Sequence, residues 1–422
     1  MFLEKEGKLI YSYDGETVCI EAWGKDALRV RATKNRSFTG RDWALEAKDA
    51  HAGEVEIFED PSAKGGAFAN MYEGTDTSYG KITNGKLHAV IDSGSVITFY
   101  HEDGRVLLKE HFRRLRDEES MPLNIMGREY SNGVGDNFRI VARFVARKGE
   151  KIFGMGQYQQ HELDLKGCML ELAQRNSQVS VPFYLSSIGY GFLWNNPGVG
   201  QVMFANNGTE WVTESGKEID YLVIAGDTPA EIEENYMTLT GKPPMMPEYG
   251  MGFWQCKLRY QTQDEVLTIA RKYKELNIPL SVIVIDFFHW TQQGDWRFDP
   301  EYFPDPKAMI DELHKMGVRV MVSIWPTVDR ASVNYEEMKE RDLLIRTDRG
   351  LNVTMECFGM ECFIDPTNPE TREFVWQKAM ENYRTLGVDL FWLDEAEPEY
   401  TVQDFVDIST SVSYTHLRAH ET

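Results

Sequence analysis

Long hydrophobic runs are missing from this chain. No apolar stretch reaches about eighteen residues, the length that a membrane-spanning helix needs. The first residues, Met1-Phe-Leu-Glu-Lys-Glu-Gly-Lys8, contain no apolar core of the kind found in a secretory signal peptide. We therefore expect neither membrane insertion nor secretion, which leaves the cytoplasm as the default location.

Cysteines are few, and their number is odd. A chain of 422 residues with five cysteines has no even framework of disulfides, so a reducing compartment is the simpler interpretation. Cys357 and Cys362 could hold a metal together with His161, His289 or His314, but the spacings match no zinc pattern. We expect buried or loop thiols, no metal and no cofactor.

Positive charge is also in deficit. The chain has 45 basic and 67 acidic residues, which gives a net charge of −22. Because nucleic acids and anionic membranes attract proteins through basic residues, neither is expected as a partner. The acidic residues are spread along the chain, which favours solubility. With 42% hydrophobic residues, the chain is long enough to build the cores of two domains.

One segment near the end of the chain carries the strongest functional signal. In Gly387-Val-Asp-Leu-Phe-Trp-Leu-Asp394-Glu-Ala-Glu397-Pro-Glu-Tyr400, a short apolar run stops at a carboxylate and then turns. The run is typical of a buried parallel strand, which would carry Asp394 at its C-terminal tip. In a β/α barrel that tip lies at the catalytic face, so Asp394 is a candidate catalytic residue. The alternative is that the acidic turn after the strand is an ordinary solvated loop.

Upstream of this segment, strands and helices alternate. Candidate strands lie at 251–256, 281–286, 318–326 and 390–394, and candidate helices at 262–276, 306–316 and 369–386. Strands that alternate with helices of ten or more residues predict parallel βαβ units. Polar or aromatic residues stand at what we expect to be the same end of every strand, namely Trp254 with Gln255, Asp286, Trp325 and Asp394.

The first half of the chain has a different pattern. Short alternating runs such as Thr17–Trp23, Leu87–Ile91 and Tyr221–Ala225 are separated by Gly, Asn and Asp, which is typical of an antiparallel sandwich. Asp227-Thr-Pro-Ala-Glu231 predicts the start of a helix, and the Pro-rich stretch Gly241–Pro247 predicts a joint.

From about Ile152 to Tyr400, the chain resembles glycoside hydrolase family 31, the retaining α-glucosidase and α-xylosidase group. The resemblance rests on the order and spacing of several short motifs: Phe153-Gly-Met-Gly156, Tyr190–Asn196, Gly252-Phe-Trp-Gln255, Val284-Ile-Asp286, Phe298-Asp299-Pro with Phe303–Pro306, Trp325-Pro326, Phe363–Pro369 and Trp392-Leu-Asp394-x-x-Glu397. It implies an N-terminal antiparallel β-sandwich domain at 1–240, followed at 241–411 by strands one to four of a (β/α)8 barrel, so the fold class is α+β and then α/β.

The resemblance also implies roles for single residues. Asp394 matches the catalytic nucleophile, and Glu397 matches an acid that supports it. Asp286 matches the residue that binds hydroxyls of the sugar before the cleaved bond, and a strand-end acid that only caps a loop is the alternative. Trp325 and Trp392 match the lining of the same sugar pocket. Phe287 and Trp254 are further candidates for contact with substrate.

The expected general acid is missing. A retaining glycosidase needs a second carboxyl about 5 Å from the nucleophile, and in this family it comes from a later strand. Too few residues follow Asp394 for four more βα units, each of about thirty residues. Glu395, Glu397 and Glu399 are conceivable substitutes, but all lie on the loop that leaves the nucleophile's own strand.

The last residues explain this shortfall. Residues 412–422 have no helical or strand period, and they match the translation, in one frame, of a transposase adapter used in sequencing libraries. We expect that segment to be an assembly artefact and the chain to be a truncated fragment, although a natural polar tail is the alternative.

Two classes of function follow. The chain is either part of an enzyme that hydrolyses terminal α-xylosides or α-glucosides, or a non-catalytic carbohydrate-binding protein on the same scaffold. An α-transglycosylase would use the same chemistry. The expected partner is an oligosaccharide or glycoside substrate, and the full-length parent could form a homo-oligomer. Sugar, linkage and leaving group stay open.

Overall fold

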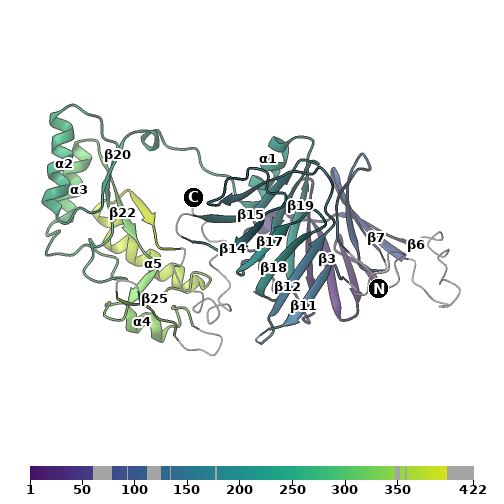
Figure 1. Cartoon of the computed structure of the whole chain (residues 1–422). Coiled ribbons are helices and arrows are strands. Elements are labelled where there is room, and N and C mark those ends of the chain that lie inside the picture. The colour runs from purple at the N-terminus through teal and green to yellow at the C-terminus, as the bar shows by residue number, and fades with distance from the viewer. Residues whose placement is uncertain are drawn as a thin grey trace. The chain divides into compact units, whose positions relative to one another are not determined.

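The computed structural model describes residues 1–59, 78–92, 94–111, 125–133, 135–175, 178–346, 352–356 and 359–396. They form two compact units. The boundary between these units in the sequence lies between Pro243 and Pro244, inside the Pro-rich joint Gly241–Pro247. Unit 1 runs from Met1 to Pro243, and unit 2 begins at Pro244 (Figure 1).

Unit 1 consists almost entirely of antiparallel strands (Figure 1). In the described residues, the largest sheet has the order β1 (Phe2–Lys5), β2 (Lys8–Tyr13), β3 (Glu16–Trp23), β4 (Ala27–Thr33), β19 (Ile219–Ala225), β16 (Tyr190–Trp194), β15 (Val179–Ser186) and β13 (Ile152–Gln157), and β5 (Ala50–His51) pairs with β3. A second sheet has the order β10 (Val106–Lys109), β9 (Ile97–His101), β8 (Leu87–Ile91), β7 (Ser78–Asn84) and β6 (Glu54–Glu59). A third has the order β11 (Arg128–Asn132), β12 (Phe138–Phe144), β18 (Thr209–Gly216), β17 (Gly200–Phe204) and β14 (Met169–Leu172).

One hydrophobic core joins these three sheets. It includes Leu9 and Tyr221 from the first sheet, Phe99 from the second and Trp211 from the third. Each large side chain buried in this way contributes roughly 1.5–3 kcal/mol. Helix α1 (Pro229–Thr240) follows β19, and its N-cap Thr228 accepts a hydrogen bond from the Glu231 amide. The expected antiparallel sandwich is therefore confirmed.

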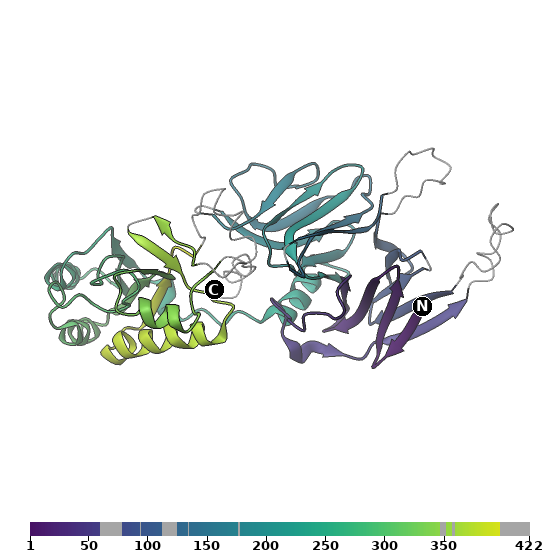
Figure 2. The same cartoon turned by 90° about the horizontal axis from the view of Figure 1, so that it is seen from below.

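Unit 2 contains the alternating strands and helices that the sequence predicts. In the described residues, its main sheet is parallel, with the order β20 (Trp254–Lys257), β21 (Val282–Ile285), β22 (Arg319–Ile324) and β26 (Leu390–Leu393). The α-helices of unit 2 are α2 (Gln263–Glu275), α3 (Pro306–Lys315), α4 (Tyr335–Glu340) and α5 (Pro369–Asn382). Unit 2 also has 3-10 turns at η3 (Glu248–Met251) and η4 (Arg384–Leu386), and unit 1 has one at η1 (Ala47–Asp49). Figures 1 and 2 show α2 and α3 side by side.

Helix starts in unit 2 follow from local side-chain chemistry. Thr262 caps α2 by accepting from the Glu265 amide, as the capping pattern predicts, and Asp305 caps α3 by accepting from the Ala308 amide.

The sequence predicted no strands or helices between Trp325 and α5. That segment holds β23 (Thr327–Asp329), α4, β24 (Met355–Glu356) and β25 (Met360–Phe363), and the three strands form a small antiparallel sheet in the order β23-β25-β24.

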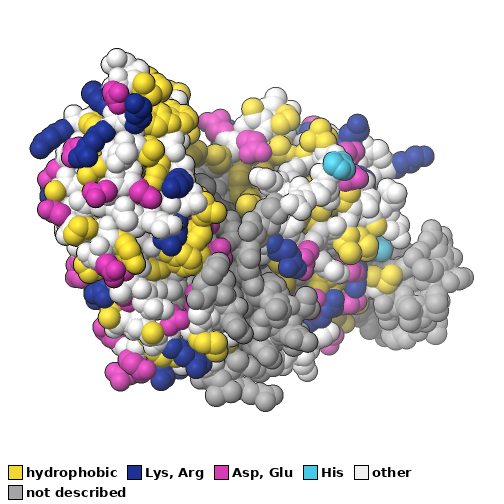
Figure 3. Space-filling model, turned by 60° about the vertical axis from the view of Figure 1, so that its left-hand side comes forward, with side chains coloured by type: hydrophobic (Ala, Val, Ile, Leu, Met, Phe, Trp, Pro, Cys, Tyr) yellow, Lys and Arg dark blue, Asp and Glu magenta, His cyan; other side chains and the backbone are white. Residues whose placement is uncertain are grey.

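Both outer strands of the parallel sheet keep an unpaired edge among the described residues, since β20 pairs with β21 and β26 pairs with β22. Hydrophobic side chains are exposed on and beside these strands, including Leu258 and Leu393. Figure 3 shows hydrophobic side chains, in yellow, among acidic and basic side chains on the surface.

Candidate active site

The parallel sheet of unit 2 has two different faces. Ile283, Ile285, Val322 and Ile324 belong to the core that contains the buried side chains of α2 and α3. Because side chains alternate along a strand, the residues between them point to the opposite face. Asp286, Trp325, Trp392 and Asp394 all have this second parity, so the sheet places them on one face.

Three of these residues also lie at one end of the sheet. Asp286 follows β21, Trp325 follows β22 and Asp394 follows β26, so each stands at the C-terminal end of a parallel strand. The Asp394 amide donates a hydrogen bond of 3.1 Å to the Ile324 carbonyl, which extends the ladder to the edge of the sheet. Since β22 separates β21 from β26 and Asp394 stands two residues further along the sheet than Asp286 in the register, the backbones of the two aspartates are about 12 Å apart, and their side chains can face a common space.

Asp286 is the more enclosed of the two carboxylates. It is 6% exposed, and its Oδ1 accepts a hydrogen bond of 2.8 Å from the Phe287 amide. Burial raises the pKa of Asp286; the Phe287 hydrogen bond lowers this pKa, and the charge on Asp394 raises it further. Asp394 is therefore close enough to act electrostatically on Asp286.

A buried histidine supports the turn that carries Asp286. His289 is fully buried, and its Nδ1 lies 2.9 Å from the Asp286 carbonyl oxygen while its Nε2 lies 2.9 Å from the Tyr383 hydroxyl. A carbonyl can only accept, so Nδ1 carries the proton and Nε2 accepts from Tyr383. Burial lowers the pKa of His289 to about 4, so the ring is neutral near pH 7. The sequence showed this residue only as a conceivable metal ligand, because its partner Tyr383, which directly follows α5, is 94 residues away in the chain.

Aromatic side chains surround the aspartates. Trp325 is buried, and its ring centroid lies 5.3 Å from that of Phe287. Trp392 is 38% exposed and stands beside Ser323 in the register, on the same face as Asp394. Trp325 and Trp392 therefore add aromatic side chains to the face that carries the two aspartates, and Phe287 packs against Trp325.

Trp254 does not lie at this end of the sheet, so the expectation that it shares a strand end with Asp286 was wrong, while its contact with substrate stays a prediction. It begins β20 and pairs with Val282, four residues before Asp286, which places it about 13 Å down the strands. Cys256, two residues further along, is the β20 residue near the site: burial raises the pKa of its thiol, and the charge on Asp286 raises it further. Strand parity and register together identify Cys256, but register was not available from the sequence.

The remaining expectations concern residues around Asp394. Glu395 has a left-handed backbone with φ of 55°, which turns the chain sharply away from β26. Glu397, Glu399 and residues 412–422 lie outside the described residues, as does Cys357.

Within the described ranges, no three His, Cys, Asp or Glu side chains are grouped so that they could hold a metal ion. None of the helices in those ranges is long and apolar enough to cross a membrane.

Comparison with known proteins matches both units. Residues 17–202 match the glycosyl hydrolase 31 N-terminal galactose mutarotase-like domain, and residues 243–421 match the glycosyl hydrolases family 31 TIM-barrel domain. The chain is 44% identical over 414 residues to the uncharacterized family 31 glucosidase ORF2 of Pseudescherichia vulneris, covering 96% of this chain and 75% of that protein. It is 31% identical to α-xylosidase A of Aspergillus niger, covering 90% of this chain and 52% of that protein.

A solved structure is similar over the whole chain. The crystal structure of a GH31 α-xylosidase from a soil metagenome, complexed with xylose, has a TM-score of 0.88 and 45% identity, covering 100% of this chain and 62% of that one. The chain thus spans between about half and three quarters of the length of these relatives. On the strength of the matched domains and of the relative that it covers to 75%, the chain belongs to glycoside hydrolase family 31.

Proposed function

We propose that the parent enzyme hydrolyses terminal α-linked xylosides or glucosides with retention of configuration. By parent enzyme we mean a protein in which this chain continues into a closed eight-stranded barrel. The observation that carries the proposal is the placement of Asp286 and Asp394 on one face, and at the C-terminal end, of a parallel sheet, where barrel enzymes hold their catalytic groups. Relatives named α-xylosidase and glucosidase support the substrate class.

In the proposed mechanism, Asp286 binds the sugar and Asp394 attacks it. The Asp286 carboxylate accepts hydrogen bonds from ring hydroxyls, and Trp325 and Trp392 cover apolar surface of the ring. An Asp394 oxygen attacks the anomeric carbon as the bond to the leaving oxygen breaks, which gives a covalent glycosyl-enzyme of inverted configuration. Water then attacks the same carbon, releases Asp394 as a carboxylate and restores the original configuration.

The proton that this mechanism needs must come from another group. A general acid gives it to the leaving oxygen and then takes one from the attacking water, so the proton balance closes over the cycle. We assign this role to a carboxyl on a later strand of the parent enzyme, and we assign Glu397 a supporting role beside the nucleophile. On this proposal, the 422-residue chain is inactive alone.

Replacement of Asp394 tests the proposal. In the parent enzyme, Asp394→Ala removes the covalent intermediate, so turnover of aryl α-xylosides and α-glucosides should fall on the order of 10⁴-fold or more. Azide should restore turnover and give a glycosyl azide of inverted configuration. Asp264→Ala, at an exposed position of α2, is the matched control and should leave turnover unchanged. Near-normal activity of Asp394→Ala would refute the nucleophile.

The same substrates separate the alternatives. Comparison of kcat/KM for the aryl α-xyloside and the aryl α-glucoside gives the preferred sugar. A parent enzyme that binds both sugars and cleaves neither would be a carbohydrate-binding protein, whereas formation of longer saccharides in place of free sugar would identify a transglycosylase.

A further inference from the structure

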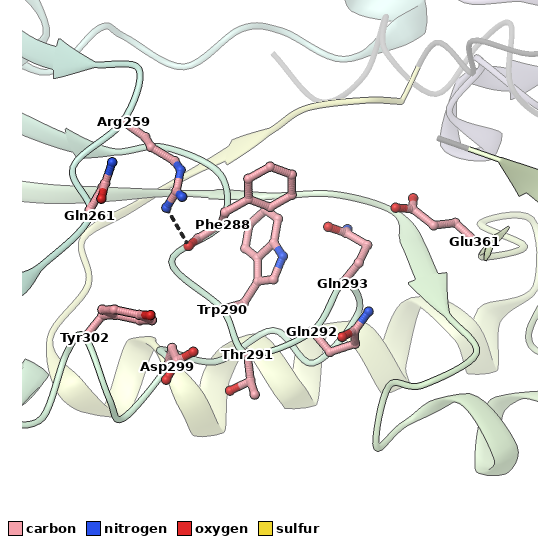
Figure 4. Close-up of a pocket in the computed structure, with 10 residues that line it drawn as sticks. All are labelled: Arg259, Gln261, Phe288, Trp290, Thr291, Gln292, Gln293, Asp299, Tyr302 and Glu361. Carbon is pink, nitrogen blue, oxygen red and sulfur yellow. Dashed lines mark hydrogen bonds between the residues drawn. The ribbon is translucent and has the colours of Figure 1, made fainter. Parts of the chain in front are cut away.

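A cavity of about 380 Å³ lies beside the proposed active site, entirely within unit 2. It is bounded by the loop after β20, the loop after β21 and strand β25 (Figure 4). Phe288, Trp290 and Tyr302 contribute aromatic surface, and most of the other lining side chains carry amide, hydroxyl or carboxylate groups. Its volume is within the range of small-molecule sites.

One polar group in the lining points to a ligand. Gln293 is 6% exposed, and its amide nitrogen donates to the Thr327 carbonyl at 3.3 Å. Its Oε1 atom is buried and has no hydrogen-bond partner among the residues that the structure describes. Figure 4 shows this amide directed toward the Phe288 and Trp290 rings. Because an unsatisfied buried carbonyl is unfavourable, a hydroxyl donor in the cavity is the partner that this atom needs.

The charges in the lining favour a neutral ligand. Asp299 and Glu361 bring two carboxylates, whereas Arg259 brings one guanidinium. That guanidinium is already engaged, since it donates to the Phe288 carbonyl at 3.3 Å and lies over the Phe288 ring. An anionic sugar would meet more negative than available positive charge. Aromatic faces combined with carboxylates and amides suit a ring that is apolar on one side and has hydroxyls at its edge.

The cavity borders the active site through a shared aromatic group. The Trp325 ring lies 5.9 Å from the Phe288 ring and 5.6 Å from the Trp290 ring, in addition to its contact with Phe287. Phe288 has a left-handed backbone, with φ of 59°, which is rare for a bulky residue, and this residue lines the cavity.

We propose that this cavity is a second saccharide-binding site, which takes one pyranose ring of a neutral saccharide. Its link to catalysis rests on the function proposed above, but the binding itself does not. The ring can belong to a distant unit of the substrate chain or to a separate saccharide, and the chemistry of recognition is the same for both.

Binding tests the site directly. In the parent enzyme carrying Asp394→Ala, the affinities for maltotriose and for α-D-xylopyranosyl-(1→6)-D-glucose are measured by calorimetry. Tyr302→Ala and Gln261→Ala remove exposed lining side chains, and each should weaken binding of at least one of these saccharides by about tenfold. Tyr13→Ala and Gln377→Ala, at exposed positions elsewhere, are the matched controls. Affinities for both saccharides that match those of the controls would overturn the proposal.

A second arm separates the two sources of the ring and keeps the site distinct from the catalytic proposal. With the active site filled by an iminosugar, binding of free maltose that Tyr302→Ala weakens indicates a separate saccharide. Saccharide binding that the iminosugar abolishes, but that Tyr302→Ala weakens in its absence, indicates a distant unit of the substrate. Absence of a Tyr302→Ala effect both with and without the iminosugar overturns the site. If the parent enzyme shows no hydrolysis but the Tyr302→Ala effect persists, the second site stands and the proposed function fails.

Discussion

His289 should make the stability of unit 2 depend on pH. The ring is fully buried between Asp286 and Tyr383, and burial lowers its pKa from 6.5 to about 4. In the unfolded chain the imidazole binds a proton below about pH 6.5, but the folded protein resists that proton until about pH 4. The stabilisation by the neutral ring is therefore fully present above pH 6.5 and is lost as the pH falls toward 4.

The size of the effect follows from the two pKa values. Relative to pH 7, linkage gives a loss of about 2 kcal/mol at pH 5 and about 3 kcal/mol at pH 4 from this residue alone. His289→Gln cannot take up the proton. It should cost stability at pH 7, because at most one of the two hydrogen bonds survives, but it should remove this part of the pH dependence.

The measurement is urea unfolding of the parent enzyme between pH 4.5 and pH 7.5. Pulsed hydrogen exchange of peptides from residues 282–298 reports unit 2 separately, since the two units need not unfold together. His161→Gln, at an exposed position in unit 1, controls for loss of a histidine. If unfolding of His289→Gln has the same pH dependence as unfolding of the unchanged protein, His289 is not a buried neutral imidazole.

Three further predictions concern separate parts of the molecule. Asp286→Asn should weaken binding of a ring-mimicking iminosugar by about 1.5–3 kcal/mol, and unchanged affinity would leave Asp286 a structural role. Asp220→Ala should destabilise unit 1 by about 3 kcal/mol in urea unfolding, because the buried Arg29 guanidinium loses hydrogen bonds of 2.6 and 2.9 Å to this carboxylate and keeps Asp42 as its close acidic partner. Asp136→Ala, which breaks an exposed pair with Lys217, should cost no more than about 1 kcal/mol. Residues 1–240 expressed alone should be soluble and unfold cooperatively. Residues 1–411 should aggregate, because β20 and β26 leave open edges, and should hydrolyse no aryl α-glycoside, because the mechanism needs a general acid from a later strand. A soluble, active 1–411 protein would contradict this.

Local features of the sequence determined the parallel strands of unit 2 and the long helices between them. The apolar runs that end in Asp286 and Asp394 are strands, and Thr262 starts a helix through a bond between its side chain and a nearby amide. Such features depend on neighbours within a few residues, so they can be inferred without the fold. The family resemblance was read in the same way, from short motifs in a particular order.

Tertiary structure decided which of these residues meet. Trp254 and Asp286 both belong to strands that the sequence indicates, but register places them about 13 Å apart. His289 meets Tyr383 across 94 residues of sequence, and Gln293 meets Thr327 from the segment that the sequence left without elements.

The physical reason is that register, loop conformation and the partner of a buried polar group are set by contacts between residues far apart in the chain. Periodicity reports which face of a strand is apolar, and strand-end acids report where polar groups collect. Neither reports how far one strand slides along the next, or which carbonyl a buried imidazole finds. In this chain, the sequence by itself determined the parallel strands of unit 2, the long helices between them and the candidate aspartates, while the support of Asp286 and the cavity beside it come only from the folded unit.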